Sequence, residues 1–242
     1  MKKTISPIII GAGGVTSYLL PPLLRTYTIQ NGLLIDGDIL EKHNLDRQLF
    51  SEKSIGQNKA KALIAANKAT KCFAAHPSYI DNSFPDSTYP DKGTHDILFI
   101  AVDNHPARRA ALALARTAAI PVIIMANEYS TSQVLYWDPL FDYYGLDAFF
   151  PTTRFPEIAT SNEGSPINCT GAVLESTPQL AMANAVSAAL GLMVFYQWKQ
   201  YDIDVEANCV PELFAIQHLP IELQTTVAGT IQSITVKDLL NQ

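Results

Sequence analysis

The stretch Ile8-Ile9-Ile10-Gly11-Ala12-Gly13-Gly14-Val15-Thr16 decides the fold. Its isoleucine run shows no polar alternation, which is typical of a strand that is buried on both faces of a sheet. The glycines predict a tight turn, and the residues after them predict a helix. A strand, a glycine turn and a helix in this order present backbone N–H groups and a helix N-terminus that favour phosphate oxygens. A tight turn without a ligand is the alternative.

Three more apolar runs continue this pattern, and each of them ends at or near a polar residue. The runs and their polar residues are 33–35 with Asp36, 97–102 with Asp103, and 122–125 with Asn127. Alanine-rich stretches at 58–70 and 106–118 lie between the runs and predict helices. Alternating strands and helices predict an α/β fold with a doubly wound, mostly parallel sheet. Ligands bind such sheets outside the carboxyl ends of the strands, so we expect the glycine turn and both aspartates to gather there.

Two segments interrupt the simple alternation of strands and helices. Pro21 and Pro22 fall inside the helix expected at 15–25 and should end, kink or restart it. Residues from about 138 to 168 lose hydrophobic periodicity and collect prolines, which predicts a long crossover loop.

The last quarter of the chain predicts a buried helix followed by β structure. The apolar run 180–196 is short for a membrane span and contains Asn184, which favours a buried helix. Two short segments after it have the composition of strands, at 214–217 and 227–236. We therefore expect a main domain over 1–200 and a small C-terminal β appendage over 201–242 that packs on the same domain.

Composition excludes several classes of protein. The chain has 242 residues, a formal net charge of −6, 48% hydrophobic residues and 17% charged residues, as globular proteins do. The acidic balance argues against nucleic acid as a partner, because phosphate contacts need clustered Lys and Arg. Cys72, Cys169 and Cys209 stand far apart and form no CxxC pair, so we expect neither a disulfide framework nor structural zinc. These features favour a cytoplasmic protein that does not enter a membrane.

Four more motifs follow the glycine turn in a fixed order. They are Asp36-Gly37-Asp38, Asn44-Leu45-Asp46-Arg47-Gln48, Gly56-Gln57-Asn58-Lys59-Ala60, and Asp103-Asn104 followed by Arg108-Arg109. This ordered set resembles the superfamily of ThiF, MoeB and the ubiquitin-activating enzymes, which have a Rossmann-like fold. The resemblance runs from about Ile8 to Arg109, with a weaker match from Cys169 to Leu192. The short form without paired cysteines is similar to ThiF-family proteins of bacterial mobile-element clusters of the PRTRC type.

The resemblance implies a site for ATP and Mg²⁺. The backbone amides of Gly11, Gly13 and Gly14 would face the phosphates. Asp36 would hold the ribose hydroxyls, and Asp103 would take the metal ion.

Three polar residues are implied as phosphate contacts by the same resemblance. They are Asn44, Arg47 and Lys59, with Gln48 as a neighbour of the site, whereas no role follows for Asp38. For Arg47 and Lys59 the alternative is a salt bridge in solvent.

The activity that the resemblance implies is ATP-dependent adenylation of a carboxylate, which releases pyrophosphate and leaves an acyl-adenylate. Positioning and charge neutralisation carry such chemistry, because a carboxylate is already a nucleophile at pH 7. In this superfamily the carboxylate usually belongs to the C-terminal glycine of a small ubiquitin-like or sulfur-carrier protein, and relatives are commonly homodimers. Cys169 resembles a family cysteine that in some relatives joins the carrier covalently, and a small buried residue is its alternative.

Other functions stay open from the sequence. A non-catalytic scaffold would keep the fold and bind a ubiquitin-like partner, although the retention of the whole motif set favours an enzyme. An NAD-dependent oxidoreductase suits the fold, but its fingerprint requires glycine at the position of Thr16. The same adenylation machinery could also act on a small molecule, a peptide or a modified RNA.

Overall fold

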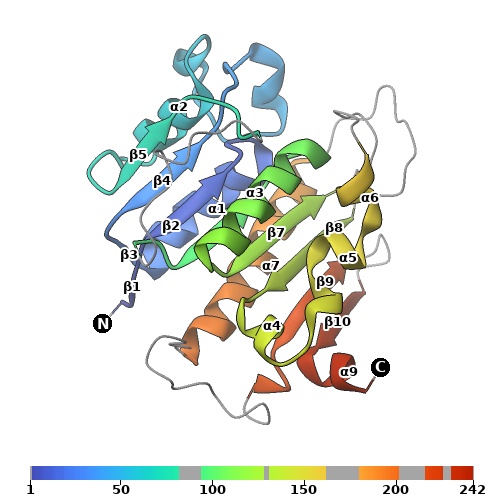
Figure 1. Ribbon diagram of the computed structural model, residues 1–242. Coiled ribbons are helices and arrows are strands. Elements are labelled where there is room, and N and C mark those ends of the chain that lie inside the picture. Colours follow the sequence, from blue (N-terminus) through green and yellow to red (C-terminus); the bar gives the residue numbers. More distant parts are fainter. Residues whose placement is uncertain are drawn as a thin grey trace.

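An eight-stranded sheet forms the centre of the protein (Figure 1). The computed structural model describes residues 2–81, 94–127, 131–161, 180–201, 216–225 and 230–241. The strand order is β10-β9-β8-β7-β6-β2-β4-β5. Its strands are β2 (Pro7–Ile10), β4 (Gly32–Ile35), β5 (Phe73–His76), β6 (Ile97–Ile100), β7 (Val122–Asn127), β8 (Ser132–Trp137), β9 (Pro220–Thr225) and β10 (Ile231–Thr235). A separate two-stranded sheet pairs β1 (Thr4–Ile5) with β3 (Thr28–Ile29) in parallel.

The sheet has a parallel half and an antiparallel half. Strands β5, β4, β2, β6 and β7 run parallel to one another, with Ile8 opposite Leu33 on one side and Leu98 on the other. From β7 onward, β8, β9 and β10 pair antiparallel. Ile8, Ile9 and Leu98 are completely buried, as their uninterrupted apolar runs predict. The predicted α/β fold with a mostly parallel sheet is thereby confirmed.

Helices cover both faces of the sheet. Figure 1 shows α3 (His105–Ala118) on one face and α1 (Gly14–Thr26) with α7 (Ala181–Gln200) on the other. Right-handed crossovers require this, because the chain moves from β2 to β4 in one direction and from β6 to β7 in the opposite direction. Helix α2 (Lys59–Ala66) connects β4 to β5.

Helix α1 corrects one expectation from the sequence. It is assigned as one helix from Gly14 to Thr26, with both Pro21 and Pro22 inside it, so the prolines do not end it. Leu19, Leu20 and Leu23 are completely buried on its inner side. This packing offsets the two backbone hydrogen bonds that the prolines cannot donate.

The predicted crossover region is not a plain loop where the structure describes it. Residues 138–161 contain short helical turns instead of extended chain. These are α4 (Leu140–Tyr143), the 3-10 turn η4 (Asp147–Phe149), α5 (Pro151–Arg154) and α6 (Pro156–Thr160). Each turn is too short for hydrophobic periodicity to reveal it in a sequence.

The C-terminal β structure joins the central sheet. Strand β9 pairs with β8, β10 pairs with β9, and the short helix α9 (Val236–Leu240) follows. Strand β10 lies inside the segment expected at 227–236, whereas β9 begins after the segment expected at 214–217, where Ile216 is helical. Among the described residues, no helix combines the length and hydropathy that a membrane crossing needs.

Candidate functional site

The glycine turn lies where three parallel strands end. Gly11 follows β2 with φ +95°, and its N–H donates to the carbonyl of Ile35 on β4 at 2.9 Å. A Cβ atom on Gly11 would lie 2.6 Å from the carbonyl oxygen of Ala101, just after β6. Both the backbone conformation and this close approach require glycine. The turn therefore brings together the ends of β4, β2 and β6, after which Asp36, Gly11 and Asp103 stand.

The start of α1 is fitted tightly to its surroundings. The Thr16 hydroxyl is buried and donates to the Gly11 carbonyl at 2.5 Å, so threonine closes the turn here. A Cβ on Gly14 would lie 2.3 Å from the Asn184 amide of α7. Gly13 is the N-cap of α1 and supplies no side-chain cap, so the first N–H groups of the helix are available to an anion.

Asp36 and Asp38 follow β4 and differ in their partners. Asp36 accepts the N–H of Ala12 at 2.6 Å and that of Asp38 at 2.7 Å. Burial raises the pKa of Asp36, although these hydrogen bonds act in the opposite direction. Asp38 pairs with Lys59 at 2.7 Å and accepts the hydroxyl of Tyr79 at 2.7 Å. Burial opposes ionisation of Asp38, but the hydrogen bonds from Lys59 and Tyr79 outweigh it and lower its pKa.

Lys59 is the first residue of α2, and its side chain is only 11% exposed. The N-cap Asn58 fixes this end of the helix, because its side-chain oxygen accepts the N–H of Lys61 at 3.2 Å. The Asn58 amide also donates to the carbonyls of Asp36 at 2.7 Å and Asp38 at 3.1 Å. Helix α2 is therefore tied directly to the chain after β4.

The segment that contains Arg47 and Gln48 lies against the first turn of α1. Asn184 donates to the Arg47 carbonyl at 3.1 Å, and the Ser17 hydroxyl accepts the N–H of Leu49 at 3.0 Å. The Arg47 side chain has no hydrogen bond or ion pair within the described residues. Gln48 is 9% exposed, and its Oε1 is buried without a hydrogen-bond partner there. Its Nε2 lies 4.0 Å from where a Cβ of Gly13 would stand.

The Asn44 side chain forms hydrogen bonds within its own turn. It belongs to the 3-10 turn η1 (Lys42–Asp46), is 4% exposed, and its Oδ1 accepts the N–H of Glu41 at 3.0 Å. Its amide contacts the His43 ring at 3.1 Å. The structure thus gives Asn44 a role in holding the segment that carries Arg47.

Asp103 is exposed at the start of the loop between β6 and α3. Within the described chain, its carboxylate accepts one long hydrogen bond, from the Asn104 amide at 3.4 Å. The side-chain oxygen of Asn104 caps α3 by accepting the N–H of Ala107. The described residues contain no cluster of metal-ligating side chains. Mg²⁺ is usually held by one or two carboxylates together with substrate phosphates, and a single exposed Asp103 fits that arrangement.

Three residues of this region had no role predicted from the sequence. Asn184 joins the Arg47 segment, the start of α1 and the end of β7, where the amide of Asn127 donates to it at 2.8 Å. Asn58 and Tyr79 hold the residues after β4. An asparagine inside an apolar helix and one before a Lys/Ala helix were the available signals. Cys169 lies outside the described residues.

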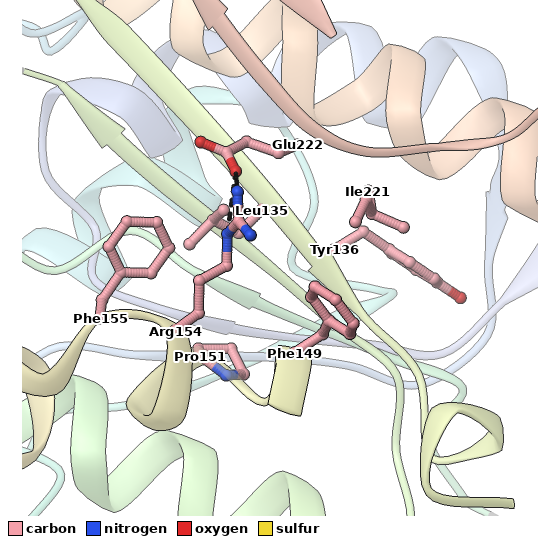
Figure 2. Close-up of a pocket in the computed structure, with 8 residues that line it drawn as sticks. All are labelled: Leu135, Tyr136, Phe149, Pro151, Arg154, Phe155, Ile221 and Glu222. Atoms are coloured by element: carbon pink, nitrogen blue, oxygen red, sulfur yellow. Dashed lines mark hydrogen bonds and ion pairs between the residues drawn. The ribbon is translucent and has the colours of Figure 1, made fainter. Parts of the chain in front are cut away.

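A small cavity lies away from this site, under the crossover helices (Figure 2). Arg154 of α5 reaches through it to Glu222 of β9, donating from Nε at 3.0 Å and also from Nη2. Gln133 of β8 donates to the same carboxylate at 2.8 Å. Phe149 and Tyr136 line the cavity with aromatic rings, as Figure 2 shows. The Arg154–Glu222 ion pair joins α5 to the antiparallel half of the sheet.

The fold and the order of motifs define a Rossmann-like α/β domain. The model of the ThiF family matches residues 2–196, and the chain belongs to the ThiF family. A 57-residue segment, 24% of the chain, is 40% identical to the ATP-dependent ubiquitin transferase-like protein Cap2 of Enterobacter hormaechei subsp. hoffmannii (strain UCI 50). That segment is 9% of Cap2.

Solved structures share the fold. The structure of E. coli MccB with ATP superposes with a TM-score of 0.64 at 18% identity, covering 96% of this chain and 64% of that one. PaaA superposes with a TM-score of 0.59 at 16% identity, covering 96% of this chain and 73% of that one. Another MccB structure contains AMPCPP and MccA. The chain thus spans less than two thirds of the length of MccB.

Proposed function

We propose that this protein adenylates a carboxylate with ATP, releasing pyrophosphate. The carboxylate oxygen attacks the α-phosphorus, the bond from that phosphorus to the pyrophosphate oxygen breaks, and pyrophosphate leaves with the bonding electrons. Membership of the ThiF family and the similarity to MccB solved with ATP support the reaction class.

The observation that carries the proposal is the buried, unpaired oxygen of Gln48, which lies beside the glycine turn next to the half-buried Arg47. The Arg47 guanidinium has no partner in the described chain, and Gln48 buries an unpartnered oxygen next to Gly13. Buried polar atoms are nearly always hydrogen-bonded, so an unpaired one calls for a missing partner. A bound triphosphate and its nucleoside would supply acceptors for Arg47 and donors for Gln48.

Each polar or charged residue of the proposed site would have a separate task in the reaction. Arg47 and Lys59 would neutralise the phosphates, the free N–H groups at the start of α1 would bind phosphate oxygens, and Asp36 would accept ribose hydroxyls. Mg²⁺, held by Asp103 and the phosphates, would spread the charge of the leaving pyrophosphate.

For the substrate, we propose the C-terminal carboxylate of a small ubiquitin-like or sulfur-carrier protein. The similarity to Cap2, which is named a ubiquitin transferase-like protein, supports this choice. A peptide is the second candidate, because MccB was solved together with MccA. Cys169 remains our candidate for a covalent link to the carrier.

We also propose that the protein acts as a cytoplasmic homodimer. Helix α7 leaves one apolar side exposed, with Met182 at 70%, Met193 at 51% and Tyr196 at 51%. Exposed apolar side chains on one helix side are typical of a protein interface.

Calorimetric titration with MgATP, and separately with NAD, tests the site. We expect MgATP to bind, and Arg47→Ala to weaken binding by about tenfold or more, because a charge-assisted contact to phosphate is lost. Arg116→Ala is the matched control, since Arg116 pairs with Asp142 at the far end of α3. Binding of NAD alone, or equal effects of the two arginine variants, contradicts the proposal.

The reaction itself is tested by ATP–pyrophosphate exchange with candidate carboxylates. Exchange that depends on a small protein with a C-terminal glycine supports the enzyme. Binding of such a protein without exchange identifies a scaffold instead.

A further inference from the structure

Asp38 connects three groups beside the proposed phosphate site. Its Oδ2 lies 2.7 Å from the Lys59 ammonium, and its Oδ1 accepts the Tyr79 hydroxyl at 2.7 Å. Its backbone carbonyl accepts the N–H of Lys59 at 2.9 Å. The side chain and the backbone of Asp38 therefore both fix the first residue of α2.

The Asp38 carboxylate fixes the direction in which the Lys59 side chain points. Its side chain is 11% exposed, and Asp38 is its ion-pair partner within the described residues. A lysine side chain has a flexible four-carbon stem, so a buried ammonium needs a fixed partner to point one way. The ammonium has three N–H donors, and one of them serves Asp38. The others are left for phosphate oxygens.

Tyr79 holds the carboxylate from the solvent side. It is 67% exposed, so its ring adds little to the apolar core. The ring lies against the Gly37 backbone, where a Cβ would meet it at 2.7 Å. Glycine between the two aspartates therefore lets the ring approach and the hydroxyl reach Oδ1.

We propose that Asp38 is the positioning residue that aims Lys59 at the triphosphate, and that Tyr79 orients the Asp38 carboxylate. The inference rests on the proposed function, because the target of Lys59 is the ATP triphosphate. It assigns Asp38 and Tyr79, which no motif role explains, to the same site.

The direction in which Asp38→Asn changes the affinity for MgATP distinguishes a positioning role from a purely electrostatic one. A carboxylate close to a phosphate repels it, so Asp38→Asn would tighten MgATP binding if Asp38 acted only through its charge. If Asp38 positions Lys59, the same change weakens binding, by about tenfold. We expect the second result.

Calorimetry with MgATP and with adenosine separates positioning from a general loss of structure. Adenosine has no phosphates, so Asp38→Asn and Lys59→Ala should weaken MgATP binding and leave adenosine binding unchanged. In the Lys59→Ala background, Asp38→Asn should add no further loss, because the two residues act as one unit. Lys61→Ala, an exposed lysine on the same helix, is the matched control and should bind MgATP like the wild type.

Tyr79→Phe keeps the exposed ring and removes only the hydroxyl, which makes it a test that folding cannot confound. We expect about a threefold loss of MgATP affinity. Gly37→Ala should give a similar loss, because its Cβ displaces the ring.

The outcomes distinguish this inference from the proposed function. A wild type that does not bind MgATP contradicts the function and the inference together. A wild type that binds MgATP, with Lys59→Ala weak but Asp38→Asn and Tyr79→Phe unchanged or tighter, overturns the inference alone. The inference is also overturned if Lys59→Ala binds MgATP like the wild type.

Discussion

Two polar clusters of this protein differ in how their groups are paired. In the parallel half, Arg47 has no side-chain partner in the described chain, and Gln48 buries an unpaired oxygen. In the antiparallel half, Glu222 accepts hydrogen bonds from Arg154 and Gln133. Unpaired polar groups cost stability and are kept where a ligand completes them. Fully paired groups hold elements together, so we interpret the Arg47–Gln48 cluster as part of a binding site and the Glu222 cluster as a structural contact.

Two aspartates differ in their neighbours and in the direction of their pKa shift. Asp38 in the parallel half has a cation beside it, and its pKa is lowered. Asp138 in the antiparallel half is 3% exposed, and burial raises its pKa despite the hydroxyl of Tyr136 at 2.5 Å and the N–H of Leu140 at 2.9 Å. The hydrogen bonds from Lys59 and Tyr79 thus favour the ionised form of Asp38, whereas burial disfavours that of Asp138.

The largest effect is expected from breaking the buried ion pair between Arg154 and Glu222. Arg154→Met should lower the free energy of unfolding by about 3 kcal/mol, because it leaves the Glu222 charge buried without its cation. Urea unfolding measures the loss. Arg116→Met, which breaks the exposed pair with Asp142, should cost less than about 1 kcal/mol. Equal losses in the two variants would contradict the structural role given to the buried pair.

Gly14→Ala should come next, with a loss of about 2 kcal/mol, because its Cβ meets the buried Asn184 amide at 2.3 Å. The change pushes α7 and the Arg47 segment away from the turn, so MgATP binding should weaken too. Gly13→Ala is the control for stability, since its nearest contact would be 4.0 Å away. If Gly13→Ala unfolds as easily, the close approach of Asn184 is not the cause.

A smaller effect is expected from Thr16→Val, which removes the buried hydroxyl that donates to Gly11. Unfolding should become easier by about 1 kcal/mol, the usual worth of one such bond. Thr117→Val provides the matched change on α3, where an exposed hydroxyl donates to the Ala113 carbonyl at 2.9 Å. We expect that control to unfold like the wild type, and a larger loss there would contradict the role given to Thr16.

The smallest effect is a pair of pH dependences with opposite signs. The stability that Asp38 contributes is present above the ordinary carboxyl pKa of 3.8 and is lost as the pH falls through its lowered pKa. The stability that Asp138 contributes is present below 3.8 and is lost as the pH rises through its raised pKa.

Unfolding of the wild type, Asp38→Asn and Asp138→Asn between about pH 3 and pH 7 tests this pair. The advantage of the wild type over Asp38→Asn should grow with pH, and its advantage over Asp138→Asn should shrink. Parallel pH curves for all three proteins would refute the assignment of the two shifts.

Local patterns predicted much of the parallel half. The runs before Asp36 and Asp103 became β4 and β6, because a strand buried on both faces needs a continuous apolar run. Strand β8 was not predicted, since the polar residues Ser132 and Gln133 begin it. Helix α1 continues past its two prolines, because burial of its leucines outweighs the low helix propensity of proline.

The order of the motifs, read alone, predicted the family and the sheet, and it indicated the edge at which we propose the site. Strand ends of a parallel sheet meet at one edge whatever the side chains do, so Gly11, Asp36 and Asp103 could be placed together. The partners of each side chain were decided only by tertiary structure. That Asp38 pairs with Lys59 and accepts the Tyr79 hydroxyl, while Arg47 stays unpaired in the described chain, depends on how α2 and the segment after β4 pack. Such contacts join residues that no local pattern relates.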